Sequence, residues 1–415
     1  MEEWKEYTVQ DLIDKGMLAE PMDGNHGEKH PKTGDYVPEG IPFIMANNLL
    51  GGTLDYNNCA FISAKQASTL VKGLAKPGDV LLTHKATIGR TAIVPNDYDL
   101  VILTPQVTYY RPIQGIDNQY LKYYFDTSKF QNLFKNWAGS GSTRAYLGIT
   151  AQHKLPIVLP DIKTQKRIAS ILSSLDDKIE LNRKINANLE AQAQALFKSW
   201  FVDFEPFRDG EFVESELGRI PKGWKVGNIY EYIDVIYGAP YKSSLFNEDK
   251  DGLPLIRIRD LKTNAPQFYT PEVLPNTEYI NAGDIVAGMD AEFIPYVWLG
   301  EKGVLNQRCC KFKGKNDAIS NYYILFLIKP ELEYVQSYKT GTTVSHLGKS
   351  DIDRFRLMTP PLDVVLAFSE RVNPMKEEVI NRAIESRRLA SLRDTLLPRL
   401  MSGELNVFDK PNDKS

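Results

Sequence analysis

Two short motifs contain residue types that could transfer a methyl group or bind a nucleotide. Thr359-Pro360-Pro361-Leu362 is the string nearest to the Asp/Asn/Ser-Pro-Pro-Tyr/Phe tetrapeptide that grips the amino group of a flipped base, but it lacks both the polar and the aromatic residue. Gly348-Lys349-Ser350 matches the end of a phosphate-binding loop, but Thr343 stands where that loop requires its first glycine. We therefore expect no catalytic residue in either motif, and we expect the Pro-Pro string to begin a helix.

Metal binding would need clustered carboxylates, imidazoles or thiols. Asp161 and Asp176 have the spacing of a nuclease site, but 15 residues of helix would separate them by about 22 Å, too far for one metal ion. The segment His26–His30 differs from the zinc helix motif by one position, and its Gly and Pro neighbours favour a surface loop. Cys309 and Cys310 are adjacent on an expected strand and would face opposite sides as packing thiols. We expect no metal site.

Basic side chains among small residues could instead contact DNA, because Arg and Lys bind guanine edges and phosphates. Arg257 and Arg259 alternate with Ile256 and Ile258, which predicts one polar face of a strand. The candidates, most of them in expected loops, are Lys85, Arg90 and Arg144 in the first half of the chain and Lys242, Arg257, Arg259 and Arg308 in the second. For each, the alternative is a solvated surface charge. Asn47-Asn48 and Gln307 are equally compatible with base reading and with turn formation.

Composition limits the class of protein. The 415 residues are 42% hydrophobic and 25% charged, as in globular proteins of two to four domains. A net charge of −3 argues against a histone-like binder that coats nucleic acid. Three cysteines and the absence of a long apolar run predict a cytoplasmic protein without membrane spans.

An internal repeat is the most informative feature of the sequence. Matched blocks recur at offsets that fall from 220 to 200 residues along the chain, so that the early parts of the two copies differ in loop length. The pairs are Trp4-Lys5 with Trp224-Lys225, Ile41–Leu49 with Leu253–Leu261, Gly78–Leu81 with Gly283–Val286, and Gly141–Gly148 with Gly341–Gly348. From the last pair through Leu196/Leu396 the offset stays at 200, so the final parts of the two copies must stay in length register.

The end of each copy predicts a long helix. Residues 163–201 contain few Gly or Pro, and apolar residues recur there in steps of four and three, which is the seam of a coiled coil. At 1.5 Å per residue, nearly 40 residues form a rod of about 60 Å. The seam consists of Ile168, Leu172, Leu175, Ile179, Asn182, Asn186, Leu189, Ala193, Leu196 and Trp200, and at the 200 offset of Phe368, Val372, Met375, Val379, Arg382, Ser386, Leu389, Arg393, Leu396 and Leu400.

Proline and polar residues interrupt these seams. Pro374 predicts a kink or a restart of the second helix, and Pro398 should mark or distort its end. Both seams turn polar at the same level, with Asn182 and Asn186 in one and Arg382 and Ser386 in the other. These four residues either meet and fix the register of an antiparallel pair, or face solvent.

The first part of each copy predicts a mixed α/β domain. Short apolar runs such as Val80–Thr83 and Gln106–Arg111 are separated by Gly, Pro and Asn, whereas Tyr120–Phe125 and Tyr322–Ile328 are expected as helices. The expected architecture is thus α/β (mixed α+β), with two globular domains joined by two long antiparallel coiled-coil helices in a pseudo-two-fold repeat. Such a molecule suits two separated sites on duplex DNA, where half-sites lie about 34–36 Å apart.

Longer motifs resemble one protein family. The segments Gln165–Ala169, Leu175–Asn182 and Ala195–Pro206 resemble the central conserved region of type I restriction–modification specificity (S) subunits, and Leu396–Leu405 resembles their distal conserved region. The Trp-Lys starts, the Gly-Asp-Val/Ile blocks and the Gly-Thr…Leu-Gly blocks resemble the borders of the two target-recognition domains of the family. The resemblance covers essentially the whole chain. Pro374 departs from the family pattern and puts the continuity of the second helix in doubt.

The resemblance implies an organisation and a function. Residues 1–160 and 222–360 would be target-recognition domains, 161–204 and 361–403 the conserved helices, 205–221 a linker and 404–415 a flexible tail. Each domain would read half of a bipartite asymmetric site in double-stranded DNA, and the helices would dock two methyltransferase (M) subunits that carry S-adenosylmethionine. Two restriction (R) subunits, which use ATP and Mg²⁺, can join such complexes. The chain itself would hold no cofactor and catalyse nothing. The alternatives are a self-sufficient methyltransferase or nuclease and a protein-only scaffold.

Overall fold

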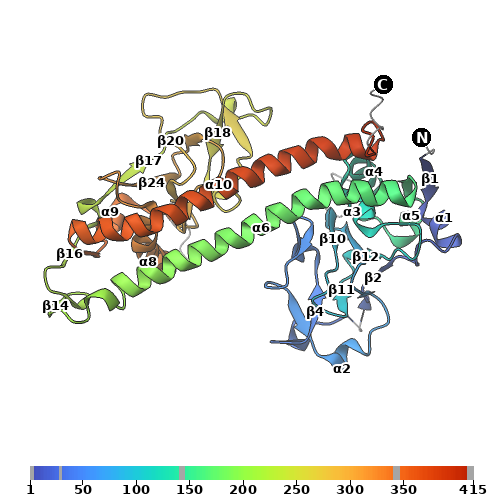
Figure 1. The fold of residues 1–415 in the computed structure, drawn as a ribbon, viewed down its shortest axis with the longest axis horizontal. Helices are drawn as coiled ribbons and strands as arrows, with labels where there is room; N and C mark the ends of the chain where they lie inside the picture. The colour runs from blue at the N-terminus through green and yellow to red at the C-terminus, as the bar shows by residue number, and fades with distance from the viewer. Residues whose placement is uncertain (1–3, 28–29, 140–144, 340–345, 409–415) are drawn as a thin grey trace, which may run out of the picture. The chain divides into compact units, whose positions relative to one another are not determined.

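The computed structural model describes residues 4–27, 30–139, 145–339 and 346–408. The chain forms two compact units: unit 1 contains Met1–Asp177 and Leu389–Ser415, and unit 2 contains Lys178–Arg388. Each unit therefore includes part of α6 (Ile162–Phe201) and part of α10 (Leu362–Met401), both of which are single helices of 40 residues (Figure 1). The predicted domain boundaries treat these helices as separate segments, and they remain a prediction.

Unit 1 is built around two sheets. The strand orders are β10-β9-β12-β2 in a four-stranded sheet and β3-β7-β4-β11-β8 in a five-stranded sheet, and β1-β13 and β5-β6 form two small pairs. The strands are β1 (Lys5–Thr8), β2 (Met22–Asp23), β3 (Tyr36–Val37), β4 (Ile41–Ile44), β5 (Leu49–Leu50), β6 (Thr53–Leu54), β7 (Ala60–Ile62), β8 (Leu74–Ala75), β9 (Val80–Lys85), β10 (Thr87–Ile93), β11 (Val101–Leu103), β12 (Val107–Tyr110) and β13 (Pro156–Leu159). The helices are α1 (Val9–Asp14), α2 (Ala64–Ala67), α3 (Asn118–Asp126), α4 (Ser128–Trp137) and α5 (Ile149–Gln152).

Unit 2 repeats this topology. Its main sheets have the orders β17-β24-β21-β22 and β19-β18-β23-β20, and β16-β25 and β14-β15 are small pairs. The strands are β14 (Phe212–Ser215), β15 (Gly218–Pro221), β16 (Lys225–Gly227), β17 (Ile233–Tyr237), β18 (Leu253–Ile256), β19 (Phe268–Thr270), β20 (Tyr279–Ile280), β21 (Ile285–Gly288), β22 (Pro295–Val297), β23 (Gly303–Leu305), β24 (Cys309–Gly314) and β25 (Leu357–Thr359). The helices are α7 (Ile258–Leu261), α8 (Asn321–Lys339) and α9 (Lys349–Ile352).

The main sheets of the two units share one topology. The five-stranded sheet of unit 1 and the β19-β18-β23-β20 sheet of unit 2 each contain one parallel pair, β4 with β11 and β18 with β23, flanked on both sides by antiparallel neighbours. Unit 1 adds the edge strand β3 and the β5-β6 hairpin. The predicted repeat and the mixed α/β class are therefore confirmed, and the insertions explain why the sequence offset changes between the matched blocks.

Within each unit, α6 and α10 pack together as antiparallel neighbours and complete the hydrophobic core. In unit 1, Ile168 and Leu172 lie in one cluster with Leu396 and Leu400. In unit 2, Phe197 packs edge-on against Phe368, with 5.9 Å between the ring centroids. Of the residues predicted to pair, Ile168, Leu172, Val372 and Val379 are buried, and Leu175, Ile179, Leu189, Leu196, Leu389 and Leu396 are half-buried. The apolar stripe of each helix therefore points inward, as its period requires.

The polar level of the seam is also buried. Asn182 has no exposed surface, and its amide donates to Glu385 Oε2 (2.8 Å) and Ser386 Oγ (3.2 Å) while its carbonyl accepts from Arg382 (3.1 Å). Asn186 donates to the Val379 carbonyl at 3.2 Å. The sequence left open whether the polar residues of the two seams meet or face solvent. In the structure they meet. A buried amide with this many partners disfavours a shifted register, because any slip would leave it unpaired.

Of the kink or restart expected at Pro374, the restart does not occur. The helix α10 continues without a break from Leu362 to Met401. Pro374 and Glu370 both lie on the exposed side of the helix, so the carbonyl that loses its partner to the proline can be hydrated. Pro398 lies one turn before the end of α10, close to where an end was expected.

Phe368→Ala should lower the free energy of unfolding of unit 2 by about 3–5 kcal/mol, because it opens a cavity among Phe197, Phe201 and Tyr323. Denaturant titration followed by tryptophan fluorescence measures this change. Leu362→Ala, at the exposed start of α10 within unit 2, is the matched control. Equal losses for the two variants would contradict the assignment of Phe368 to the core.

Candidate nucleic-acid interface

The same sharp corner occurs once in each unit, where a central strand of the four-stranded sheet ends. In unit 1, Lys85 ends β9 and is followed by Ala86 with φ +63°. In unit 2, Asp290 follows β21 and precedes Ala291 with φ +62°. An L-residue in this left-handed region costs roughly 1–2 kcal/mol. The same strained residue recurs at one offset in both copies, and because backbone strain tends to cluster at functional sites, the two corners are candidates for the interface.

The backbone around the two corners makes the same hydrogen bonds. In each unit, the backbone amide of residue 147 or 347 donates to the carbonyl of the residue two places before the strained alanine. The amide of that residue in turn donates to the carbonyl of the residue that precedes the neighbouring strand, β12 or β24. In unit 1 these bonds are Leu147 N to His84 O (3.0 Å) and His84 N to Gln106 O (2.9 Å); in unit 2 they are Leu347 N to Met289 O (2.7 Å) and Met289 N to Arg308 O (2.8 Å). Isolated β-bridges also join Lys85 to Tyr146 and Asp290 to His346.

The corner of unit 1 presents a cation beside an aromatic ring. Lys85 is exposed, and its Nζ lies 5.9 Å from the ring centroid of Tyr146, which is itself 48% exposed. The nearby Arg90 lies on β10 and approaches the carbonyls of Ala46 (3.4 Å) and Leu49 (3.3 Å). Lys85 and Arg90 were expected in loops, and this is wrong, because the chain forms a β9–β10 hairpin there.

The corner of unit 2 holds three polar side chains in contact. Arg308 lies just before β24, and its NH1 is 3.1 Å from Oδ2 of Asp290. The other carboxylate oxygen of Asp290 lies 2.6 Å from Nδ1 of His346. The Arg308 side chain remains 58% exposed, so the carboxylate orients the guanidinium without burying it.

The arginines expected on one strand face are placed differently. The strand β18 ends at Ile256, Arg257 caps the short helix α7, and Arg259 lies within that helix, so the predicted alternation is wrong. The Arg257 guanidinium is tied to Asp260 (3.3 Å) and lies 4.3 Å from the Phe268 ring centroid, so it serves packing. The Asp260 carboxylate accepts from the Arg257 backbone amide, and this cap ends the strand locally.

The remaining basic candidates have less defined surroundings. Arg259 is exposed and its side chain has no ion pair within the described residues. Lys242 is 74% exposed, with its Nζ 3.9 Å from Glu272. Arg144 lies outside the described residues, as do Gly141–Thr143 and Gly341–Thr343. Sequence reasoning did not single out Tyr146, Gln106, Asp290 or His346, although the 205- and 200-residue offsets could have aligned most of them.

Directly behind the corner of unit 1 lies a buried histidine. Nδ1 of His84 is 3.0 Å from the Leu147 carbonyl, and its Nε2 has no hydrogen-bond partner and lies 3.9 Å from Asp23. Burial lowers the pKa of His84 by more than the Leu147 carbonyl and Asp23 raise it. A neutral His84 therefore holds the segment that carries Tyr146 against β9.

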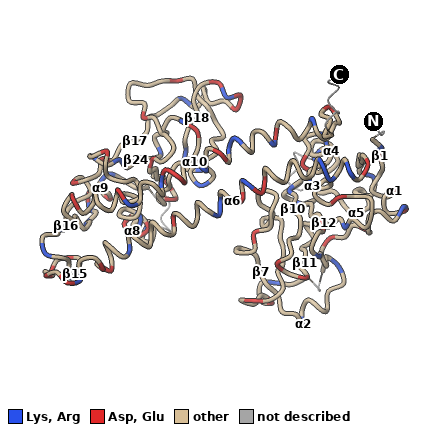
Figure 2. The backbone as a smooth tube through the Cα atoms, in the orientation of Figure 1, with Lys and Arg blue, Asp and Glu red and all other residues tan. Residues whose placement is uncertain are grey.

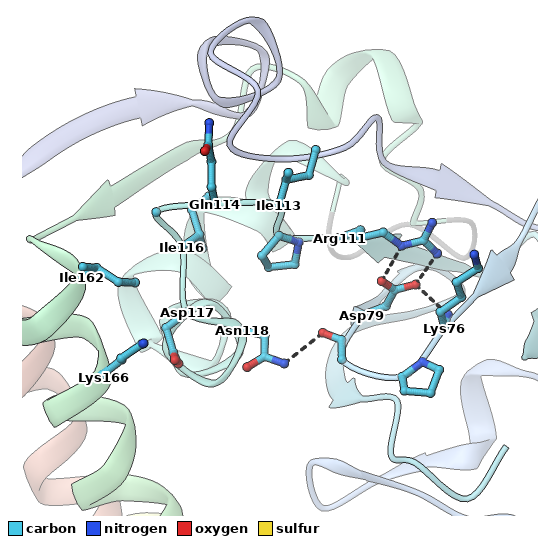
Figure 3. A pocket seen from close by; sticks show the side chains of 14 residues that line it. Lys76, Asp79, Arg111, Ile113, Gln114, Ile116, Asp117, Asn118, Ile162 and Lys166 are labelled. Atoms are coloured by element: carbon cyan, nitrogen blue, oxygen red, sulfur yellow. Dashed lines mark hydrogen bonds and ion pairs between the residues drawn. The ribbon is translucent and has the colours of Figure 1, made fainter. Parts of the chain in front are cut away.

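A hollow of about 550 Å³ lies elsewhere in unit 1, between the turn before β9 and the start of α6 (Figure 3). Its strongest charges neutralise each other, since Arg111 makes two 2.7 Å bonds to the buried Asp79 (Figure 3). Unit 2 has a half-buried carboxylate, Asp284, at the equivalent position, 3.0 Å from Lys311. An ion pair therefore stabilises this turn in both units, and the charged residues of the hollow have a structural role.

The motifs considered above for catalysis or metal binding have structural roles. Thr359 ends β25 and Leu362 begins α10, so the Pro-Pro string is a helix entry as expected. Asp161 caps α6 by accepting from the amides of Lys163 and Thr164, and hydrogen bonds from Thr164 lower its pKa. Cys309 and Cys310 are buried in separate clusters, and burial raises the pKa of Cys310 to about 12. Across the described residues, no group of three His, Cys, Asp or Glu side chains is arranged to hold a metal ion.

Charge is mixed along the rest of the chain. Figure 2 shows blue and red segments alternating along α6 and α10, in agreement with the small net charge. In the part of the chain that the structure covers, no helix combines the length and apolar character needed to cross a bilayer. Any DNA contact must therefore rest on local basic groups such as those at the two corners.

Comparisons with known proteins place this architecture in a family. The model of the type I restriction modification DNA specificity domain matches residues 1–191 and 221–364. The chain belongs to this family, whose members are the sequence-selecting, non-catalytic components of type I restriction–modification enzymes.

Individual relatives are similar to this chain over nearly its full length. The type I restriction enzyme MjaIX specificity subunit of Methanocaldococcus jannaschii is 31% identical, over 97% of this chain and 94% of that protein. The HindI specificity subunit of Haemophilus influenzae is 25% identical, over 98% and 100%. The crystal structure of the S subunit from M. genitalium has the same fold, with a TM-score of 0.53 at 14% identity over 96% of both chains.

Acidification should destabilise unit 1 through His84. The folded pKa lies below the unfolded value of about 6.5, so the contribution is complete above pH 7 and is lost as the pH falls below about 6.5, by at most about 1.4 kcal/mol per pH unit. Urea unfolding at pH 7.5 and 5.5 should show a smaller acid loss for His84→Gln than for the wild type. His153→Gln is the control, and an unchanged acid loss in His84→Gln would refute the prediction.

Proposed function

We propose that this chain reads a bipartite, asymmetric sequence in double-stranded DNA, with one half-site bound by the sheet domain of each unit. The observation that carries the proposal is the repetition: the same sheets and the same strained corner occur twice, with different side chains at equivalent positions. Two similar domains with different surfaces suit two unlike half-sites. The DNA-contacting candidates are Lys85, Arg90, Arg144, Lys242, Arg259 and Arg308, whereas the Arg257 contacts favour a structural role.

The two long helices are proposed to set the spacing and to dock the catalytic partners. In this arrangement two M subunits, which would supply S-adenosylmethionine and the methyl-transfer site, bind α6 and α10, and two R subunits with ATP and Mg²⁺ can join them. The complex would act on DNA in the cytoplasm. The packing of α6 against α10 within each unit would give such partners a rigid surface to bind.

Co-expression with a type I methyltransferase subunit from the same organism, followed by methylation sequencing of the host DNA, tests the function. A bipartite motif with an unread spacer is expected. Methylation by the isolated chain with labelled S-adenosylmethionine would instead support the self-sufficient enzyme, and an assembled complex that protects no DNA sequence would support the scaffold.

A seven-residue insertion in both helices should lengthen the spacer and leave both half-sites unchanged. One heptad placed after Asp177 and one after Arg388 keeps the apolar seam in phase and adds about 10 Å, roughly three base pairs. Methylation sequencing reads the new spacer directly. The same insertion in α6 alone is the control and should abolish methylation, because it shifts one seam against the other. Altered half-site letters with the original spacer would contradict the proposed role of the helices.

Exchange of residues 42–147 for the same segment of another family member should change one half-site and leave the other intact. The reason is that this segment contains both main sheets of unit 1 except β2 and β3, and no strand of unit 2. A motif altered in both halves would argue against independent reading by the two units.

A further inference from the structure

Two residues stand out when the two corners are compared position by position. Gln106 in unit 1 and Arg308 in unit 2 occupy the same backbone position, because the carbonyl of each accepts from the residue two places before the strained alanine. These hydrogen bonds are equivalent in the two units, although β10 begins at Thr87, directly after the corner, whereas β22 begins only at Pro295. Different side chains at an equivalent backbone position give two similar domains a simple way to select different bases.

The two side chains have matching chemistry for different purines. The NH2 group of a glutamine amide can donate to N7 of adenine while its carbonyl oxygen accepts from the N6 amino group, whereas the arginine fork donates to O6 and N7 of guanine. Gln106 is half-exposed, and its carboxamide has no hydrogen bond to any described residue. Arg308 is mostly exposed and keeps donors free after its contact with Asp290.

The surroundings of Arg308 favour a reading role over a general phosphate contact. A phosphate contact gains from an unopposed positive charge, yet Arg308 is paired with the Asp290 carboxylate, which repels phosphate. The pairing fixes the orientation of the guanidinium, and a fixed planar fork loses less conformational entropy when it binds a base edge. His346 holds the second oxygen of the same carboxylate, so the orientation is set from two sides.

We propose that Gln106 reads an adenine in the half-site of unit 1 and that Arg308 reads a guanine in the half-site of unit 2. Asp290 and His346 are positioning residues that hold Arg308, and the strained turns at Ala86 and Ala291 fix the corner on which each reader stands. This inference rests on the proposed function, since it assigns residues to half-sites that the proposal predicts.

The test uses the complete chain assembled with its M subunit and methylation sequencing of the host genome. Arg308→Gln should lower the preference for guanine at one position of one half-site by about tenfold or more, because a good bidentate contact discriminates by about that factor. Gln106→Arg should replace or relax one adenine in the other half-site. The spacer and all remaining letters should stay unchanged in both variants.

Matched controls separate reading from bulk charge. Arg219→Gln in unit 2 and Gln114→Arg in unit 1 make the same substitutions at exposed positions outside the corners, and they should leave the motif unchanged. Asp290→Asn and His346→Gln should weaken discrimination at the same base pair as Arg308→Gln, whereas a merely structural role would lower methylation of all sequences equally. Arg308→Lys, which keeps the charge but lacks the fork, decides the case if Arg308→Gln fails to assemble with the M subunit.

The outcomes are distinguishable. Wild-type letters in both half-sites of the Arg308 and Gln106 variants, or changes in both half-sites from one variant, would overturn the inference and leave the proposed function standing. Absence of any bipartite motif from the wild-type complex would overturn the proposed function itself.

Discussion

The packing of α6 against α10 is the interaction on which the rest of the structure depends. Neither unit closes its core without both helices, because Leu400 of α10 lies in the cluster of unit 1 and Phe197 of α6 lies in that of unit 2. Each helix is amphipathic and would expose its apolar stripe if it were alone. The buried Asn182, with bonds to Glu385, Ser386 and Arg382, makes one register more favourable than its neighbours.

On this support the chain carries two versions of one domain. Strand order, the parallel central pair and the ion-paired carboxylates Asp79 and Asp284 are shared, so they belong to folding. The corners share a strained backbone but differ in side chains, with Lys85 and Tyr146 in one and Asp290 and His346 in the other. Features common to both units thus define the frame, and the differences between them mark where recognition can diverge.

The expectations that proved right or wrong separate along physical lines. Local features were predictable. The helical seam and the placement of Cys309 and Cys310 on opposite faces of a strand follow from spacing, and helices α3 and α8 follow from apolar, aromatic runs. The alternation of Arg257 and Arg259 failed, because Asp260 caps a helix at that point and four residues of alternating pattern cannot reveal a cap. Pro374 was expected to interrupt α10, but its effect depends on which side of the helix faces water, and only packing decides that.

The sequence by itself determined the repeat, the mixed α/β class, the two long helices and the family, because these depend on period, length and motif order along the chain. Only the tertiary structure decided that Asn182 meets Arg382, that Arg257 is tied into the protein, and that Gln106 and Arg308 are equivalent. The reason is that a side chain's partners come from segments distant in sequence. Hydrogen bonds and ion pairs act over about 3 Å, and that proximity exists only once the sheets and helices have packed.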